Sequence, residues 1–222
     1  MQKLNDQLTF THIQLLHTSN RNQIVRCNYK KGRKVNSCVL KLFPTKFRLS
    51  FEQERETYNK LLDANTNLLY PLPLGYTKWS VAKYEEVIGS TIGSILDGTP
   101  SNDSGVYVLM LHFIENAKQL DKVYPSLQLA IEIIASLDNL HRIRIVHGDL
   151  SLSNILLIKE SLTDVGKIMF LDFASSWTNA SRKQLEWETK NAVEFFAAWV
   201  HNSPSTPYPS LLPKVNIFKL TC

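Results

Sequence analysis

Short runs of apolar residues that alternate with polar ones dominate the first part of the chain. Three of these runs, residues 8–18, 22–30 and 35–43, are rich in β-branched and aromatic residues and are predicted to form strands. Gly32 interrupts the sequence KKGRK between the second and third runs, which predicts a turn flanked by solvated cations. Further along, residues 67–79 predict a loop that enters a strand.

Apolar residues at helical spacing come next. Residues 49–64 are predicted to form a helix with Ser50 as its N-cap. Its apolar face is expected to consist of Phe51, Tyr58, Leu61 and Leu62. Residues 80–96 predict a strand, a short connector and the start of a helix. Later helices are predicted at about Val106–Leu120, Ser126–His141 and Lys183–His201.

Two strand-like segments, residues 144–158 and 166–177, interrupt these later helices. Turn-forming residues at 98–105 are the best candidate for a linker. Strands and one helix therefore precede a region in which helices dominate. This order predicts an α+β protein with a β-rich lobe, an α-rich lobe and a cleft between them.

Composition narrows the class of protein further. Apolar residues make up 44% of the 222 residues, which supports a substantial core and argues against disorder. The net charge of +5 fits phosphate-bearing partners, but we expect no direct nucleic-acid readout because no dense run of Lys and Arg is apparent. No apolar run approaches the roughly 20 residues of a membrane span. Three cysteines without metal-type spacing and the lack of a signal peptide predict a cytoplasmic or nuclear protein.

The sequences HGDLSLSN and FLDFASS contain candidate catalytic and metal-binding residues. Asp149 and Asp172 each follow an apolar run or a turn, and Asn154 lies between them. Phosphoryl transfer from a nucleotide needs one carboxylate that orients the accepting hydroxyl. It also needs a second carboxylate and an amide oxygen that hold Mg²⁺, since hard cations prefer oxygen ligands. A hairpin-like pair of strands is expected to bring the two loops together.

The pattern His-x-Asp-x-x-x-x-Asn followed by Asp-Phe-x resembles the catalytic and metal-binding loops of the protein-kinase-like superfamily. The resemblance implies that Asp149 is the catalytic base, that Asn154 and Asp172 bind Mg²⁺, and that His147 is a structural residue of the loop. It covers most of the chain, from about residue 8 to residue 201.

Two further segments carry the same resemblance. CVLKLF resembles the third-strand lysine motif, so Lys41 is expected to contact the α- and β-phosphates of ATP. FEQERETYNKL resembles the partner helix, and Glu54 is the expected partner of this lysine, with Glu52 and Glu56 as alternatives. YEEVIGSTI resembles the hinge between the lobes. The resemblance therefore implies that backbone groups near Glu85, Glu86 and Val87 hold the adenine.

The chain departs from the family pattern in three places. The expected turn between the first two strands contains no glycine, which leaves Ser19, Asn20 and Asn22 as possible substitutes for a glycine-rich loop. Gly148 stands where His-Arg-Asp loops have arginine, and Ala174 replaces the glycine of Asp-Phe-Gly. No Ala-Pro-Glu motif follows Asp172, so the C-terminal lobe is expected to be short.

His-Gly-Asp loops resemble those of small atypical kinases, such as aminoglycoside and choline kinases. The compact ending most resembles the small kinase of the KEOPS complex, or a fungal-type kinase-like protein. The expected fold is a single bilobal kinase-like domain over residues 1–222, with a β-rich N-lobe at 1–86 and a mainly helical, shortened C-lobe at 87–222.

The resemblance implies an ATP- and Mg²⁺-dependent phosphotransferase, in the first place an atypical protein serine/threonine kinase. Three alternatives stay open: a pseudokinase that serves as a scaffold, an ATPase switch in a complex, and a small-molecule kinase. The sequence leaves the acceptor and any protein partner open.

Overall fold

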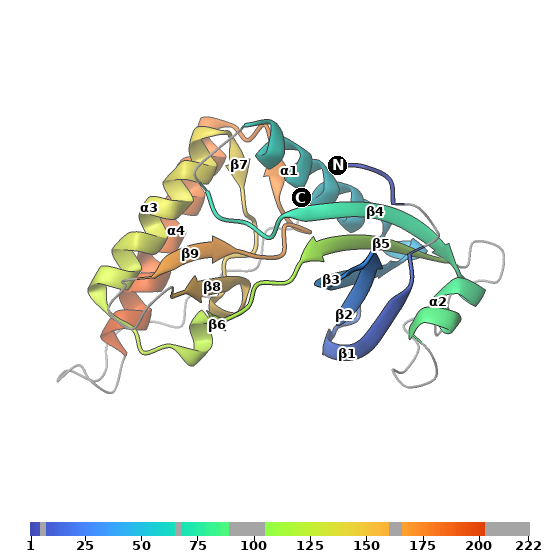
Figure 1. Cartoon of the computed structure of the whole chain (residues 1–222). Helices are drawn as coiled ribbons and strands as arrows, with labels where there is room; N and C mark the ends of the chain where they lie inside the picture. Colours follow the sequence, from blue (N-terminus) through green and yellow to red (C-terminus); the bar gives the residue numbers. More distant parts are fainter. Residues whose placement is uncertain (5–7, 65–67, 89–104, 160–165, 203–222) are drawn as a thin grey trace. The chain divides into compact units, whose positions relative to one another are not determined.

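The computed structural model of the chain has mixed α and β structure (Figure 1). It describes every residue except 5–7, 65–67, 89–104, 160–165 and 203–222. The predicted linker at 98–105 lies almost wholly outside the described residues. The chain divides into two compact units: unit 1 comprises Met1–Lys60 and Pro71–Glu115, and unit 2 comprises Leu61–Tyr70 and Asn116–Cys222.

The last connection from unit 1 to unit 2 lies later in the chain than the predicted lobe boundary at residue 86. The chain passes into unit 2 for the last time between Glu115 and Asn116. The difference arises because residues 105–112 form a strand of the sheet in unit 1.

Unit 1 is built on a five-stranded antiparallel sheet with the strand order β1-β2-β3-β5-β4. Its strands are β1 (Phe10–Thr18), β2 (Gln23–Lys31), β3 (Lys34–Pro44), β4 (Pro73–Ser80) and β5 (Gly105–His112). A two-residue turn joins β2 to β3, and Gly32 in this turn has a φ of 63°. The predicted turn and the first three predicted strands are confirmed.

The two faces of this sheet are covered by different helices. On one face, α2 (Val81–Ile88) contributes Tyr84 and Ile88 to a buried apolar cluster that also contains Leu40 and Leu42 of β3. On the other face, Phe51 of helix α1 stacks on Tyr107 of β5 with ring centroids 4.9 Å apart. Helix α1 spans Arg48–Asp63.

A pair of cysteines lies in the apolar cluster. Cys27 of β2 and Cys38 of β3 are paired across the strands, with their Sγ atoms 3.4 Å apart and both side chains buried. The hydrogen bond between the two thiols, together with burial, raises the pKa of the Cys38 thiol. The Cys38 thiol is therefore held in its protonated form, and both side chains pack as small apolar groups.

The predictions for the start of α1 and for residues 106–120 are wrong. The predicted N-cap Ser50 lies inside α1, because the 3₁₀ turn η1 (Thr45–Phe47) leads the chain into the helix two residues earlier. The predicted helix Val106–Leu120 is instead β5 followed by the short strand β6 (Ala117–Gln119). β5 lies between β3 and β4 and is buried on both faces, so its sequence shows no alternation and resembles a buried helix.

Unit 2 combines two helices with short strands. Helices α3 (Leu127–Arg142) and α4 (Arg182–His201) pack side by side (Figure 1). A three-stranded antiparallel sheet has the order β6-β8-β9, and β7 pairs with β10 in a separate ribbon. The strands are β7 (Ile145–Val146), β8 (Ile155–Ile158), β9 (Lys167–Phe170) and β10 (Trp177–Thr178); the 3₁₀ turns are η3 (Leu120–Lys122) and η4 (Leu152–Asn154).

Local signals explain where these helices begin. The Ser126 hydroxyl accepts a hydrogen bond from the backbone of Leu129 and caps α3. Ser181 and Gln184 form a capping box at the start of α4. Both helices lie within a residue of their predicted positions. In the part of the chain that the structure describes, no helix is both long and apolar enough to cross a membrane.

Candidate active site

Lys41 and Glu54 form a buried ion pair within unit 1. Lys41 lies on β3 and Glu54 on α1, with 2.7 Å between Nζ and Oε2. Their side chains are only 3% and 1% exposed. The Nζ atom also lies 5.2 Å from the ring centroid of Phe43, on the same face of the strand. A buried charge is costly unless it is paired, so each side chain holds the other in its ionised form.

The geometry also shows why Glu54 is the partner. Glu54 lies on the buried stripe of α1, four residues before Tyr58 and seven before Leu61. Glu52 instead accepts a hydrogen bond from Arg48 at 2.7 Å, on the outer side of the helix. The predicted contact between Lys41 and Glu54 is confirmed, while its role toward a nucleotide remains a prediction.

In unit 2, strand β7 leads into a loop that carries Asp149 and Asn154. The side-chain amide of Asn154 donates to the backbone oxygen of Asp149 at 3.0 Å and to its carboxylate at 3.2 Å. Asn154 itself ends the 3₁₀ turn η4. One amide group therefore fixes both the backbone and the side chain of Asp149. With its nitrogen committed in this way, the amide oxygen of Asn154 is the atom suited to bind a cation.

Strand pairing brings the predicted metal ligands to neighbouring backbone positions. Ile155 at the start of β8 pairs with Phe170 at the end of β9. The backbone N–H of Leu171 donates to the backbone oxygen of Asn154 at 2.8 Å. Asp172 follows with a φ of 60°, and its carboxylate accepts a hydrogen bond from the Ala174 backbone at 3.2 Å. The expectation that paired strands bring the two loops together is confirmed.

The buried side chain of His147 connects the same two loops through hydrogen bonds. Its Nε2–H donates to the backbone oxygen of Leu171 at 2.8 Å, and its Nδ1 accepts from the Asp149 N–H at 3.3 Å. The fully buried ring packs against Phe170 and Phe173, with centroids 5.7 and 5.1 Å away. These two hydrogen bonds select the neutral tautomer with its proton on Nε2. His147 is a structural residue of the loop, as predicted.

Glu188 is a residue of this site that the sequence did not reveal. It lies on α4, is 3% exposed, and accepts hydrogen bonds from the backbone N–H groups of His147 at 3.0 Å and Gly148 at 2.7 Å. His141 of α3 lies with Nε2 2.8 Å from the same carboxylate, and Thr189 holds the other ring nitrogen at 3.1 Å. The Glu188 carboxylate thus connects helices α3 and α4 to the backbone of the loop that carries Asp149.

A signal for Glu188 exists in the sequence. Glu188, Ala192 and Phe196 occur four residues apart, and all three are buried on one face of α4. A charged residue on an otherwise apolar stripe indicates a buried carboxylate that needs partners. The aromatic residues around it drew attention to core packing and obscured this signal.

The electrostatics of Glu188 follow from these contacts. Burial by itself raises the pKa of the carboxyl group. The hydrogen bond from His141, the electrostatic interaction with His147 and the backbone hydrogen bonds from Gly148 and His147 outweigh this effect, so the pKa of Glu188 lies below its ordinary value. The side chain is therefore an anion at neutral pH, despite its burial.

Gly148 is required by the backbone geometry of the loop. Its φ is +78°, and a Cβ atom at this position would lie 2.1 Å from the backbone oxygen of Ser175. The turn that contains Ser175 is itself closed by the Ser176 hydroxyl, which donates to the Phe173 oxygen at 2.6 Å. The two loops therefore approach each other so closely that only glycine fits, which explains why no arginine stands before Asp149.

In the turn between β1 and β2, backbone N–H groups form hydrogen bonds within the turn, unlike those of a glycine-rich loop, which bind phosphates. The Ser19 hydroxyl accepts from the backbone N–H groups of Arg21 and Asn22, both at 3.1 Å. Ser19 also donates its own N–H to the Asn22 oxygen at 2.9 Å. Backbone donors that would otherwise be aimed at a phosphate are thus satisfied inside the turn. Whether Ser19, Asn20 and Asn22 substitute for a glycine-rich loop stays a prediction, and in this geometry the N–H groups of Ser19, Arg21 and Asn22 are not directed at a ligand.

Glu85, Glu86 and Val87 do not lie at the connection between the units. They belong to α2 of unit 1, not to the predicted strand and connector. Their backbone groups belong to the last turn of a helix and not to an extended segment between the units. The prediction for these three residues is corrected accordingly.

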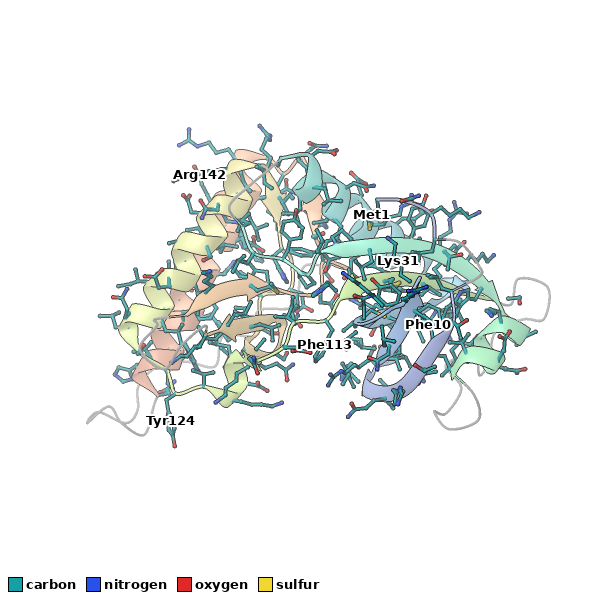
Figure 2. All side chains as sticks on the ribbon, in the orientation of Figure 1. Met1, Phe10, Lys31, Phe113, Tyr124 and Arg142 are labelled. Carbon is teal, nitrogen blue, oxygen red and sulfur yellow. The ribbon has the colours of Figure 1, made fainter. Side chains whose placement is uncertain are left out.

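Figure 2 shows the described side chains of both units. A scan of the chain against protein-family models gave no match, and a search of curated proteins gave none either.

Proposed function

We propose that the chain is an ATP- and Mg²⁺-dependent phosphotransferase, and specifically an atypical protein serine/threonine kinase. The observation that carries the proposal is the buried ion pair between Lys41 and Glu54. Replacing a buried ion pair with apolar residues is often neutral or stabilising by about 1–4 kcal/mol. The need for a stable fold therefore does not explain why such a pair is present. A lysine on the third strand that pairs with a glutamate of the next helix is the arrangement that orients Lys toward nucleotide phosphates in kinases.

Unit 2 supports the proposal with the second set of residues. In this mechanism Asp149, held by Asn154, orients the hydroxyl acceptor and accepts its proton. The Asn154 amide oxygen and the Asp172 carboxylate would hold Mg²⁺, which matches the preference of this ion for oxygen ligands. The metal would offset the charge of the β- and γ-phosphates. Lys41 would offset the charge of the α- and β-phosphates.

The architecture supports the same class of protein. A β-rich unit with one helix inserted between its third and fourth strands, and a second unit with two long helices and the predicted loops, agree with a bilobal kinase-like fold with a short C-terminal lobe. In this proposal the backbone of residues 113–115, which follows β5 and leads into unit 2, replaces Glu85–Val87 as the segment that holds the adenine.

A second candidate function is favoured by the β1–β2 turn. Because Ser19 satisfies the N–H groups of Arg21 and Asn22, this turn offers few donors to phosphates. A pseudokinase, in which the same fold serves as a scaffold, would retain the buried ion pair and the anchored loop but bind ATP weakly. The two candidates differ in a measurable property, the turnover of ATP.

The deciding experiment measures phosphoryl transfer from radiolabelled ATP with Mg²⁺ to a generic basic protein. Asp149→Ala is the test variant and Asp121→Ala, an exposed acidic residue of the same unit, is the matched control. We expect the wild type and the control to transfer label, and Asp149→Ala to be slower by about 10²–10⁴-fold. Label on protein indicates a protein kinase, free phosphate indicates an ATPase, and label on a small hydroxyl compound indicates a small-molecule kinase.

Two outcomes contradict the proposal. If Asp149→Ala transfers label as fast as the wild type, Asp149 is not the base and the mechanism is wrong. If the wild type neither turns over ATP nor gains thermal stability with Mg²⁺ and ATP, the pseudokinase is the better assignment. Circular dichroism of each variant shows whether a loss of activity reflects unfolding.

A further inference from the structure

Positive charge is concentrated in one part of the chain. Residues 7–51 contain nine Lys and Arg residues and no Asp or Glu. The other residues contain 16 Lys and Arg against 20 Asp and Glu, so the net charge of +5 hides a strongly basic segment and a mildly acidic remainder. The basic residues are Arg21, Arg26, Lys30, Lys31, Arg33, Lys34, Lys41, Lys46 and Arg48.

Four of these cations gather at the end of the β2–β3 hairpin. Lys30, Lys31, Arg33 and Lys34 flank or occupy the two-residue turn at Gly32, and all four side chains are exposed (Lys31 is labelled in Figure 2). Lys31 and Lys34 are directly paired across the two strands. Among the residues that the structure describes, no carboxylate forms an ion pair with any of the four. We name these four residues the hairpin tip.

The hairpin tip does not owe its charge to the needs of the fold. The turn requires a residue with positive φ, which Gly32 provides at 63°. Like charges directly opposite each other on paired strands are destabilising, by up to about 1 kcal/mol. The Lys31–Lys34 pair therefore costs the isolated protein some stability, and an anionic partner would offset this cost.

We propose that the hairpin tip binds the phosphodiester backbone of a nucleic acid. Protein interfaces usually have an apolar centre, and binding to a membrane surface usually uses inserted apolar side chains, yet Lys30–Lys34 contains neither. Contact with phosphates needs cations alone and is independent of base sequence. A two-stranded ribbon is also narrow enough to enter the major groove of B-form DNA.

This proposal goes beyond the phosphotransferase activity and does not depend on it. It also revises the expectation that no dense run of cations is present. Gly32 divides the run in the sequence, but the hairpin brings the residues on its two sides together. The proposed contact reads no bases, so it requires none of the sequence motifs of base-specific binding.

The test is the affinity of the full chain for a fluorescent 30-nucleotide RNA, single-stranded and duplex, measured by anisotropy from 50 to 200 mM salt. The test variant is Lys31→Gln/Arg33→Gln/Lys34→Gln. In the wild type we expect binding that weakens with salt. Removing three phosphate contacts lowers the slope of log K against log salt by about two for single strands and by nearly three for B-form DNA, which serves as a further probe.

The matched control is Lys118→Gln/Lys122→Gln/Lys183→Gln, which removes the same charge from exposed positions of unit 2. We expect this control to keep the wild-type slope. Equal losses in both variants would show that net charge alone drives binding, and would overturn the assignment to the hairpin tip. The absence of wild-type binding at 50 mM salt would overturn it as well.

Two further probes define the chemistry of the partner. Polyglutamate presents a carboxylate polyanion, and vesicles with anionic headgroups present a membrane surface. We expect both to bind more weakly than RNA, and to depend less on the hairpin tip. Preferential binding of either probe through these residues would overturn the nucleic-acid assignment. Thermal melting should show the test variant folded, with stability equal to or slightly above the wild type.

Discussion

Among the described residues, each unit of the molecule contains one deeply buried glutamate, and the two are neutralised in different ways. In unit 1, Glu54 faces the ammonium group of Lys41 at 2.7 Å. In unit 2, Glu188 collects two backbone N–H groups and the Nε2 atom of His141, all within 3.0 Å. The first carboxylate is balanced by a side-chain charge, and the second by donors that belong mainly to the backbone of a loop.

This difference predicts that one of the two glutamates is needed for the proposed activity and the other for the fold. Both members of a side-chain ion pair can be replaced together by apolar residues, often with little loss of stability. Backbone N–H groups cannot be removed, and each one left unsatisfied when buried costs about 1–3 kcal/mol. Glu54 is therefore replaceable for the fold but not for the proposed chemistry, whereas Glu188 is needed for the shape of the loop that carries Asp149.

The largest expected effect comes from breaking the unit 2 arrangement. Glu188→Ala leaves three donors without an acceptor, two of them buried and one half-buried, so we expect the free energy of unfolding to fall by about 4 kcal/mol. Urea denaturation measures this change. Glu186→Ala on the same helix removes only an exposed ion pair with Arg182 and should cost no more than about 1 kcal/mol. Similar losses in the two variants would refute the anchoring role of Glu188.

The next effect tests the unit 1 pair. Lys41→Met leaves Glu54 buried without its cation, and we expect the free energy of unfolding to fall by about 3 kcal/mol. Lys41→Met/Glu54→Leu removes both charges and should recover most of this loss, while phosphoryl transfer stays absent in both variants. The double-mutant cycle in urea measures the recovery. Additive losses would show that the pair is not a replaceable ion pair, and would erase the contrast with Glu188.

A pair of glycines sharpens the comparison at the level of the backbone. Gly148 and Gly32 both have positive φ, but an added Cβ meets the Ser175 oxygen at 2.1 Å at the first position and no atom within 4 Å at the second. We expect Gly32→Ala to cost about 1 kcal/mol from backbone strain alone. Gly148→Ala should cost about 1–2 kcal/mol more, because the two loops must move apart. Equal melting temperatures for the two variants would contradict the close approach.

Local signals made most elements of the fold predictable. Capping residues such as Ser126, glycine turns such as Gly32, and alternation in the first three strands all act over a few residues. Strand β5 was predicted as a helix because its burial on both faces removes the alternation of apolar and polar residues. That burial is set by strands far away in the sequence. The last connection between the units was misplaced for the same reason.

The candidate site shows the same division. Lys41 and Glu54 were paired correctly, because strand alternation and helical spacing place them on facing surfaces. Glu188 was missed because the aromatic residues around it indicate core packing, and because its backbone partners, about 40 residues away, cannot be identified from the sequence. The turn at Ser19 contains suitable residue types, but only the structure shows that its donors are used internally.

The smallest expected effect is a pH dependence that comes from Glu188. Its pKa is lowered in the folded state by the hydrogen bonds it accepts, so its ionised form stabilises the protein above the unfolded value of about 4.3. This stabilisation declines as the pH falls through the lower folded value. We therefore expect the difference in unfolding free energy between the wild type and Glu188→Gln to be constant from pH 7 to about pH 5 and to shrink below pH 4. A difference that grows on acidification would mean that burial, not hydrogen bonding, controls this carboxylate, and would contradict the role of its hydrogen bonds in neutralising it.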